Sequence, residues 1–259
     1  MKAVYYRKRK KKKIRGLIFI ICLFFLILAG IFFVLFRFKI KTLEISGNRE
    51  VSAEEVRSVL NYKNIFSATE DKIKNDLFKK FPQILELEVS RDMAKRGIEI
   101  KIKEREEFGI ICRAEKIKQE NIEIDQTQNC FYIDKNGVIF KDAPQTSGSL
   151  VILIKDYSNR DYKLGEKIFE EKIMNFILET KDFLSSEVDL KIVDFNILSF
   201  PPDDLKVVID EGWYILFNLQ KEAGDQLSAL KAVLDEKIKD KRNELDYIDL
   251  TIENRVYYK

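Results

Sequence analysis

Three patterns of apolar and polar residues follow one another along the chain, and the first is an unbroken apolar run. Residues 17–36 read LIFIICLFFLILAGIFFVLF and contain no charged side chain. A helix rises ~1.5 Å per residue, so this run covers roughly 30 Å, the hydrocarbon thickness of a bilayer. Every backbone amide then bonds within the helix, as lipid requires. The pattern predicts a transmembrane helix at residues 16–36.

A strongly basic tail precedes the run. Residues 1–15 contain nine Lys and Arg residues and no acidic residue, whereas the net charge of the whole chain is only +3. Basic flanks stay in the cytoplasm, so we expect everything from Arg37 onward to lie outside it. Such a tail beside a membrane span is more typical of a topology signal with affinity for anionic lipid than of a nucleic-acid site. We therefore predict no nucleic-acid partner.

A cleaved signal peptide is the alternative interpretation of a basic tail followed by an apolar run. The run is longer than an ordinary signal core, and no A-x-A pattern follows it. Ile21 precedes Cys22, whereas lipoprotein processing requires a small residue there. We interpret residues 16–36 as an uncleaved signal anchor.

The second pattern begins near Phe38, where apolar and polar residues start to alternate. Alternation predicts a half-buried strand over residues 40–46, ended by a turn at Gly47-Asn48. Two helices are predicted next, each opening on a Ser and a Glu three residues apart, at Ser52 and Glu55 and at Ser67 and Glu70. Pro82 ends the second helix.

Alternation returns after this proline and predicts two more strands. Their inward positions are Leu85, Leu87 and Val89, and then Ile98, Ile100 and Ile102. The predicted order is β-α-α-β-β, with both helices packed on one face of a three-stranded sheet. The open edges of such a sheet invite pairing with another chain.

The third pattern, from Glu106 onward, consists of several short strands with fewer helices. Strands are predicted at residues 108–112 and 130–133, with a polar loop between them. Asp134-Lys135-Asn136-Gly137 then predicts a hairpin turn before residues 138–140, and we interpret Asp134 as a turn residue and not as a catalytic acid. Cys112 and Cys130 form one disulfide if their strands are neighbours, or remain two buried thiols, and the sequence leaves both open.

The remainder of this region alternates between helix and strand. We predict an apolar strand at residues 150–154, a helix that begins after Leu164-Gly165, and an amphipathic helix over residues 227–238. Further strands are predicted at residues 188–197, 205–210 and 213–217. Trp213 is expected to pack on the sheet and not to bind a ligand. The fold class is therefore α+β: a membrane helix, a small domain, and a larger domain rich in antiparallel strands with flanking helices.

The amino-acid composition argues against most kinds of catalytic site. The chain has no histidine, which is the commonest general base near neutral pH and the commonest metal ligand. Of three cysteines one lies in the apolar run, so too few remain for a zinc site. No phosphate-binding loop, His-based triad or G-x-S-x-G elbow occurs. We predict a protein that is not an enzyme and has no cofactor, metal or small-molecule substrate; a glycosidase-type carboxylate pair is the catalytic alternative.

The small domain resembles a POTRA domain, a polypeptide-binding module of bacterial envelopes. The likeness is carried by Leu43-Glu44-Ile45-Ser46-Gly47-Asn48 with Val51-Ser52, by Asn64-Ile65-Phe66, by Phe81-Pro82 and by Ile100-Lys101-Ile102-Lys103-Glu104-Arg105. One POTRA domain directly after a signal anchor resembles the FtsQ/DivIB family of cell-division proteins. This resemblance implies four parts: a cytoplasmic tail (1–15), an anchor (16–36), a POTRA-like domain (37–105) and an FtsQ-type β domain (106–259).

The end of the chain resembles the terminal strand signature of the same family. Tyr247-Ile248-Asp249-Leu250 and Asn254-Arg255-Val256-Tyr257-Tyr258 carry the likeness, and Thr251 departs from it where the family usually has Arg. The resemblance implies a scaffold at the division septum that joins FtsB/DivIC-like and FtsL-like partners through its last strands. The partner-binding residues it indicates are Tyr247, Asp249, Leu250, Arg255, Val256 and Tyr257, for which ordinary strand packing is the alternative.

Two further classes of protein stay open. A POTRA-bearing protein can also serve polypeptide transport or chaperoning, although such proteins usually carry several POTRA domains or a membrane barrel. A membrane-anchored cell-wall hydrolase would need two ionisable carboxylates in a cleft. We favour a single-pass scaffold of the cytoplasmic membrane that binds its partners by strand addition.

Overall fold

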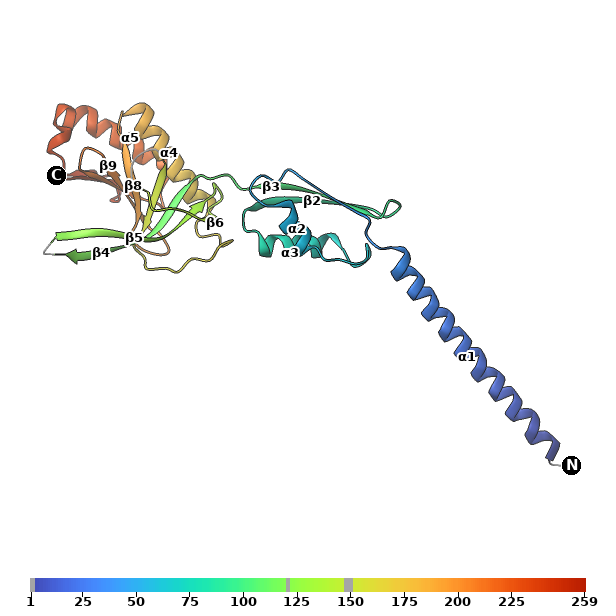
Figure 1. The fold of residues 1–259 in the computed structure, drawn as a ribbon. Helices are drawn as coiled ribbons and strands as arrows, with labels where there is room; N and C mark the ends of the chain where they lie inside the picture. The colour runs from blue at the N-terminus through green and yellow to red at the C-terminus, as the bar shows by residue number, and fades with distance from the viewer. Residues whose placement is uncertain (1–2, 120–121, 147–150) are drawn as a thin grey trace. The chain divides into compact units, whose positions relative to one another are not determined.

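The computed structural model describes residues 3–119, 122–146 and 151–259, and the chain divides into two compact units at Glu104 and Arg105. The first element, helix α1 (Ala3–Arg37, blue in Figure 1), includes the predicted span and continues into the basic tail. Its segment Gly16–Phe33 is long and apolar enough to cross a membrane, and none of it is buried against the rest of the protein.

The rest of the first unit is a three-stranded sheet with two helices. Its elements are β1 (Thr42–Ser46), α2 (Ala53–Val59), α3 (Glu70–Lys80), β2 (Ile84–Asp92) and β3 (Gly97–Glu104). The strand order is β1-β3-β2, with β1 parallel and β2 antiparallel to β3. Val56 of α2, Ile73 and Leu77 of α3, and Ile100 of β3 meet in one core. The predicted β-α-α-β-β order is confirmed.

The two predicted capping signals have different outcomes. Ser52 caps α2, because its hydroxyl oxygen accepts a hydrogen bond from the Glu54 amide at 3.3 Å. Ser67 does not cap α3, which begins only after Thr69. The Ser67 hydroxyl instead donates to the Asn64 carbonyl at 2.7 Å, and the Ser67 amide donates to the same carbonyl at 3.1 Å. A tight turn at Asn64 therefore uses the serine that spacing alone assigned to the helix.

The second unit contains one mixed sheet of nine strands. Its strand order is β12-β11-β10-β9-β8-β7-β4-β5-β6, and the pairs β4–β7, β7–β8 and β10–β11 are parallel. The strands are β4 (Gly109–Gln119), β5 (Ile122–Ile133), β6 (Ile139–Asp142), β7 (Ile152–Asp156), β8 (Ile192–Ile197), β9 (Asp204–Ile209), β10 (Tyr214–Asn218), β11 (Tyr247–Asp249) and β12 (Tyr257–Tyr258). The helices are α4 (Glu171–Glu187) and α5 (Ala223–Val233), the latter followed by a π-helical turn, Leu234–Ile238, and a 3₁₀ segment, Lys239–Glu244.

The polar loop predicted between residues 112 and 130 is wrong. Strands β4 and β5 continue through it as one long hairpin, paired from Arg113↔Gln128 to Gln119↔Ile122. Polar side chains form hydrogen bonds across its outer part: Gln128 Nε2 donates to Glu115 Oε1 at 3.1 Å. Glu115 and Lys116 are both exposed, as are Asp125 and Gln126, so these neighbouring residues do not alternate as in a half-buried strand.

Other boundaries also shift. Helix α4 begins at Glu171 and not directly after Gly165. Ile168 and Phe169, which the predicted helix would include, are buried but lie before α4, where the Ile168 amide donates to the Gly137 carbonyl at 2.8 Å. Strand β8 begins at Ile192, because α4 runs to Glu187. The start of the strand predicted at residues 150–154 lies outside the described residues, and the described strand is β7.

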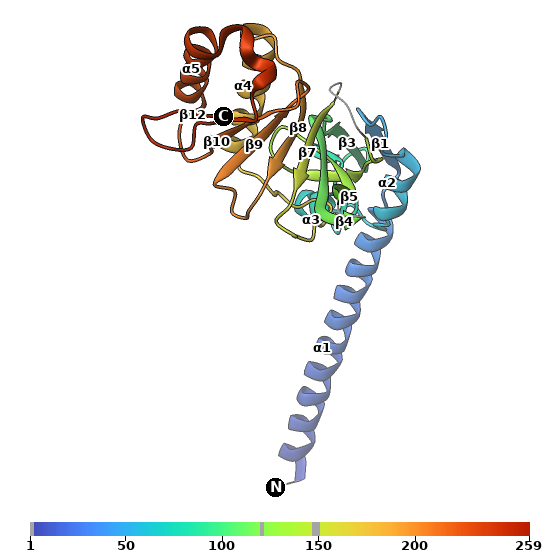
Figure 2. The ribbon, with the colours of Figure 1, turned by 90° about the vertical axis from the view of Figure 1, so that its left-hand side faces the viewer.

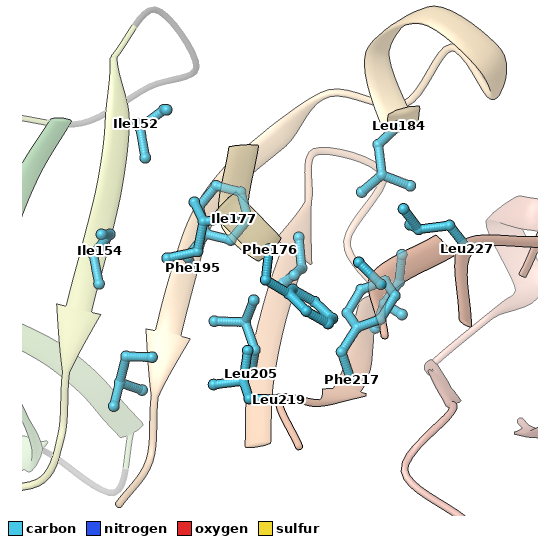
Figure 3. Packing of buried hydrophobic residues seen from close by; sticks show 14 of the residues in the cluster. Ile152, Ile154, Phe176, Ile177, Leu184, Phe195, Leu205, Phe217, Leu219 and Leu227 are labelled. Atoms are coloured by element: carbon cyan, nitrogen blue, oxygen red, sulfur yellow. The ribbon is translucent and has the colours of Figure 1, made fainter. Parts of the chain in front are cut away.

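The core of the second unit lies between the sheet and its two helices. Figures 1 and 2 show α4 and α5 side by side, and Figure 3 shows their side chains meeting those of the sheet. Phe176 of α4 packs edge to face on Phe217 of β10, with ring centroids 5.7 Å apart. Trp213 is 1% exposed and its Nε1 donates to Glu211 at 3.0 Å, so its predicted packing role is confirmed.

Candidate partner interface

The carboxyl-terminal strand forms one rim of the nine-stranded sheet. Strand β11 lies parallel to β10, with Tyr214 opposite Tyr247 and Ile215 opposite Ile248. Strand β12 lies antiparallel to β11 and occupies the end of the strand order, beside the marked C-terminus in Figure 2. The outer side of β12 is therefore an open strand edge, the structure to which an extended peptide can add.

The register at this rim defines which backbone groups face outward. The amide of Lys259 donates to the Tyr247 carbonyl at 3.2 Å, and the amide of Tyr247 donates back to the Lys259 carbonyl at 3.3 Å. In an antiparallel pair, such exchanging residues alternate with residues whose backbone groups point away from the partner strand. Tyr258, opposite Ile248, is such a residue. Its amide and carbonyl point to the outer side, and the same alternation predicts an outward amide at Val256.

The sheet face away from the helices carries an aromatic row at this rim. The rings of Tyr214 and Tyr247 stack with centroids 5.8 Å apart and planes 20° apart. Lys206 Nζ lies 4.0 Å above the Tyr214 ring, and burial, followed by the positive charge of Lys116, lowers the pKa of Lys206. Tyr257 is 45% exposed and its hydroxyl accepts from Arg255 Nη1 at 3.3 Å. These rings and cations present a surface suited to a polypeptide partner.

The other residues that the sequence indicated have local structural contacts. Asp249 Oδ1 accepts hydrogen bonds from the Thr251 amide at 2.9 Å and from the Thr251 hydroxyl at 2.7 Å. Leu250 is buried in the core, and Val256 packs against the same core at its margin. Thr251, which stands where the related family usually has Arg, thus closes the turn after β11 by bonding Asp249.

A groove beside the rim was not expected from the sequence. A cavity of about 690 Å³ lies between the start of α5 and the loop that joins β11 to β12. Lys221 Nζ donates to the Thr251 carbonyl at 3.0 Å and connects the two walls. Ile252 on the loop wall is 48% exposed. The sequence did not indicate Lys221, Ile252, Tyr214 or Lys206. Strand pairing brings Tyr214 and Lys206 to this rim, and the approach of the last loop to the start of α5 forms the groove at Lys221 and Ile252.

The described residues contain no group of three or more His, Cys, Asp or Glu side chains placed to hold a metal ion. Asp134, the carboxylate at the start of the hairpin turn, is 2% exposed and accepts hydrogen bonds within that turn. Its Oδ1 accepts from the amides of Asn136 at 3.0 Å and Val138 at 2.9 Å, while Oδ2 accepts from the Arg105 guanidinium. A carboxylate with these partners is held as a structural acceptor of the turn.

Cys112 and Cys130 form a disulfide. They lie directly opposite each other on β4 and β5, with their Cα atoms 4.1 Å apart. The bridge is buried among Ile110 and Leu153 on the sheet face away from the main core. Of the two interpretations that the sequence left open, the structure has the bridged one.

The chain consists of an apolar helix long enough to cross a membrane, a small β-α-α-β-β domain and a larger sheet domain. Residues 38–105 match the family described as POTRA domain, FtsQ-type. Together with the apolar N-terminal helix, this match supports an FtsQ/DivIB-like protein. The match covers the small domain and does not extend into the sheet domain. A comparison of the chain with curated proteins gave no significant match.

Proposed function

We propose that this protein is a non-enzymatic scaffold of the bacterial division machinery. Helix α1 anchors it in the cytoplasmic membrane at the septum, with the basic tail in the cytoplasm and both folded units outside. The FtsQ-type POTRA domain and the charge of the tail support this proposal. The Cys112–Cys130 disulfide supports the same orientation, because disulfides persist in oxidising compartments outside the cytoplasm.

The partners we propose are FtsB/DivIC-like and FtsL-like membrane proteins, bound by strand addition at β12. One observation carries this part of the proposal: Tyr258 turns its amide and carbonyl to the open rim of the sheet. An added strand gains main-chain hydrogen bonds there, and its alternate side chains meet the face that holds Tyr247 and Tyr257. We assign the contact to Tyr247, Asp249, Leu250, Arg255, Val256 and Tyr257, with Tyr258 as a backbone donor.

The test compares proline substitutions at the two rims of the sheet. The full chain in lipid nanodiscs is titrated with the exported parts of the candidate partners. Tyr258→Pro removes the outward amide of β12, while Tyr258→Ala removes the ring and keeps the amide. Asp142→Pro is the matched control at the β6 rim, because Asp142 neighbours Ala143, whose amide bonds inward to the Cys130 carbonyl at 2.8 Å.

We expect Tyr258→Pro to lose binding, and Tyr258→Ala and Asp142→Pro to retain it, with unchanged circular dichroism for all three. Full binding by folded Tyr258→Pro protein would refute strand addition at β12. Loss of binding only in Asp142→Pro would move the interface to the β6 rim. Absence of binding by the unchanged protein would refute the proposed partners.

A further inference from the structure

Three segments of the POTRA domain meet where the chain leaves α1: residues 37–41, 61–66 and 92–97. The Phe38 carbonyl accepts a hydrogen bond from the Ile65 amide at 3.1 Å. The Lys41 amide donates to the Arg96 carbonyl at 2.9 Å, and Arg96 Nη1 donates to the Arg37 carbonyl at 2.7 Å. The first residues after the helix are therefore fixed to the turn before α3 and to the β2–β3 turn.

This junction exposes large apolar side chains. Phe66 is 49% exposed, and its ring packs on Phe38 with centroids 5.0 Å apart. Met93, in the β2–β3 turn, is 40% exposed. Apolar side chains such as Phe, set among basic residues, are typical of protein surfaces that insert into the boundary between lipid headgroups and acyl chains.

The same three segments are strongly basic. They contain a single acidic residue, Asp92, which lies 3.8 Å from Lys95 Nζ. Their six basic residues are Arg37, Lys39, Lys41, Lys63, Lys95 and Arg96. This charge complements an anionic surface and is distinct from the basic tail, because it lies on the opposite side of the apolar span.

The chain itself keeps this junction near a bilayer. The apolar run ends at Phe36, and Phe38 follows two residues later. Two residues of helix advance roughly 3 Å, which lies within the headgroup layer on one side of a membrane. Phe38 therefore reaches the headgroup layer, and Phe66 accompanies it because the two rings are in contact.

We propose that Phe38, Phe66 and Met93, with the six basic residues around them, form a membrane-docking patch that binds the anionic phospholipid surface. The rings and the thioether enter the headgroup layer, and the cations contact lipid phosphates. Docking holds the POTRA domain against the membrane from which it emerges. The patch is separate from the β12 rim and does not depend on the proposed partners.

The test uses tryptophan as a depth probe in the full chain, reconstituted into vesicles of neutral lipid or of neutral lipid mixed with phosphatidylglycerol. The native Trp213 is buried in the second unit and supplies a constant background. Phe66→Trp places a probe in the patch. Phe78→Trp is the matched control, because Phe78 is 39% exposed but lies on α3, outside the three segments. Brominated lipids in the vesicles then quench any tryptophan that enters the headgroup layer.

We expect brominated lipids to reduce the emission of the Phe66→Trp variant and to leave that of the Phe78→Trp variant at the level of the unchanged protein. Adding Lys63→Glu and Lys95→Glu to the Phe66→Trp variant, or using neutral vesicles alone, reduces the quenching. Equal quenching of both probes, or none of either, in variants with unchanged circular dichroism would overturn the proposal. Quenching that ignores both charge changes and lipid charge would overturn its anionic part.

Discussion

Tyr214 and Tyr247 lie opposite each other on the parallel strands β10 and β11, and their rings stack on the open face of the sheet. Strand β11 has only three residues, so this stack and the burial of Ile248 on the other face hold it in register. Strand β12 pairs with β11, and the geometry of the rim therefore depends on the same contact.

Tyr247→Ala removes the stack. We expect the free energy of unfolding to fall by about 1 kcal/mol, the usual contribution of an aromatic cross-strand pair, and partner binding to weaken. Tyr247→Phe keeps the ring and is the control. Denaturant unfolding and the nanodisc titration measure the two effects. An equal loss of stability in Tyr247→Phe would show that the hydroxyl, and not the stack, is responsible.

Val256→Pro removes a backbone amide that the alternation directs to the outer side of the rim. We expect loss of partner binding, because proline cannot donate to an added strand. Val256→Ala, which keeps the amide and reduces the packing, should bind partners and lose roughly 1 kcal/mol or more of stability. Complex formation by a folded Val256→Pro protein would exclude this register of strand addition.

Glu104 at the end of β3 holds the loop before α2. Its Oε1 accepts from the amides of Arg49 at 2.7 Å and Val51 at 3.0 Å, and its Oε2 accepts from the amide of Glu50 at 3.0 Å. Partial burial acts to raise the pKa of Glu104, but the three amides outweigh it and lower the pKa below its ordinary value. The charged carboxylate is thus favoured by folding.

Because the pKa of Glu104 is lower in the folded than in the unfolded protein, its ionised carboxylate stabilises the fold. This contribution is complete above the unfolded pKa of about 4.3, and it is lost as the pH falls through the lower pKa of the folded state. We expect Glu104→Gln to cost about 1 kcal/mol at pH 7, since charged acceptors bind amides more strongly than neutral ones but this site is partly solvated. The difference between the two proteins should vanish in strongly acidic buffer. Thermal unfolding between pH 7 and pH 3 measures it, and a constant difference would contradict the assignment.

The Cys112–Cys130 bridge predicts one reactive thiol, Cys22, in unreduced denatured protein and three after reduction. Replacing both bridge cysteines by Ser should lower the free energy of unfolding by about 3 kcal/mol, a typical value for a loop of this length. Replacing Cys22 by Ser is the control and should not change the stability of the folded units. Three reactive thiols before reduction would exclude the bridge.

Gly137 and Gly212 both have positive φ, and replacing each by Ala distinguishes the cost of backbone strain from the cost of a steric clash. Gly137 has φ 79°, and a Cβ there would lie 2.1 Å from the Phe169 carbonyl oxygen. Gly212 has φ 95°, and a Cβ added there would have no atom within 4 Å apart from its own chain neighbours. We expect Gly212→Ala to cost about 1 kcal/mol, from conformation alone, and Gly137→Ala to cost clearly more. Equal losses in denaturant unfolding would show that the Phe169 segment moves aside.

The pattern of apolar and polar residues was sufficient to predict a helix or strand wherever one face of that element is buried. Ile98, Ile100 and Ile102 alternate because β3 lies at the centre of its sheet with helices on one face, and the sequence predicts that strand well. In the β4–β5 hairpin Glu115, Lys116, Asp125 and Gln126 are exposed, so these residues resemble a loop in the sequence. Ser67 failed as a helix cap because the Asn64 turn competes for the same hydroxyl.

The candidate interface was predictable only in part. The sequence indicated Tyr247, Asp249 and Tyr257 through a resemblance, but it contains no signal for Tyr214 or Lys206, which reach the rim through the pairing of β10 with β9 and β11. The groove beside Lys221 likewise depends on how α5 meets the last loop.

By itself, the sequence determined an N-terminal helix apolar enough to cross a membrane, the β-α-α-β-β domain and the absence of histidine, because hydrophobic length, periodicity and composition are local properties. The tertiary structure decided that Cys112 faces Cys130, that Tyr258 opens outward at the sheet rim, and that Phe66 joins Phe38 beside the membrane anchor. Each of these contacts joins residues distant in the chain, and their pairing depends on strand register and packing of the whole fold.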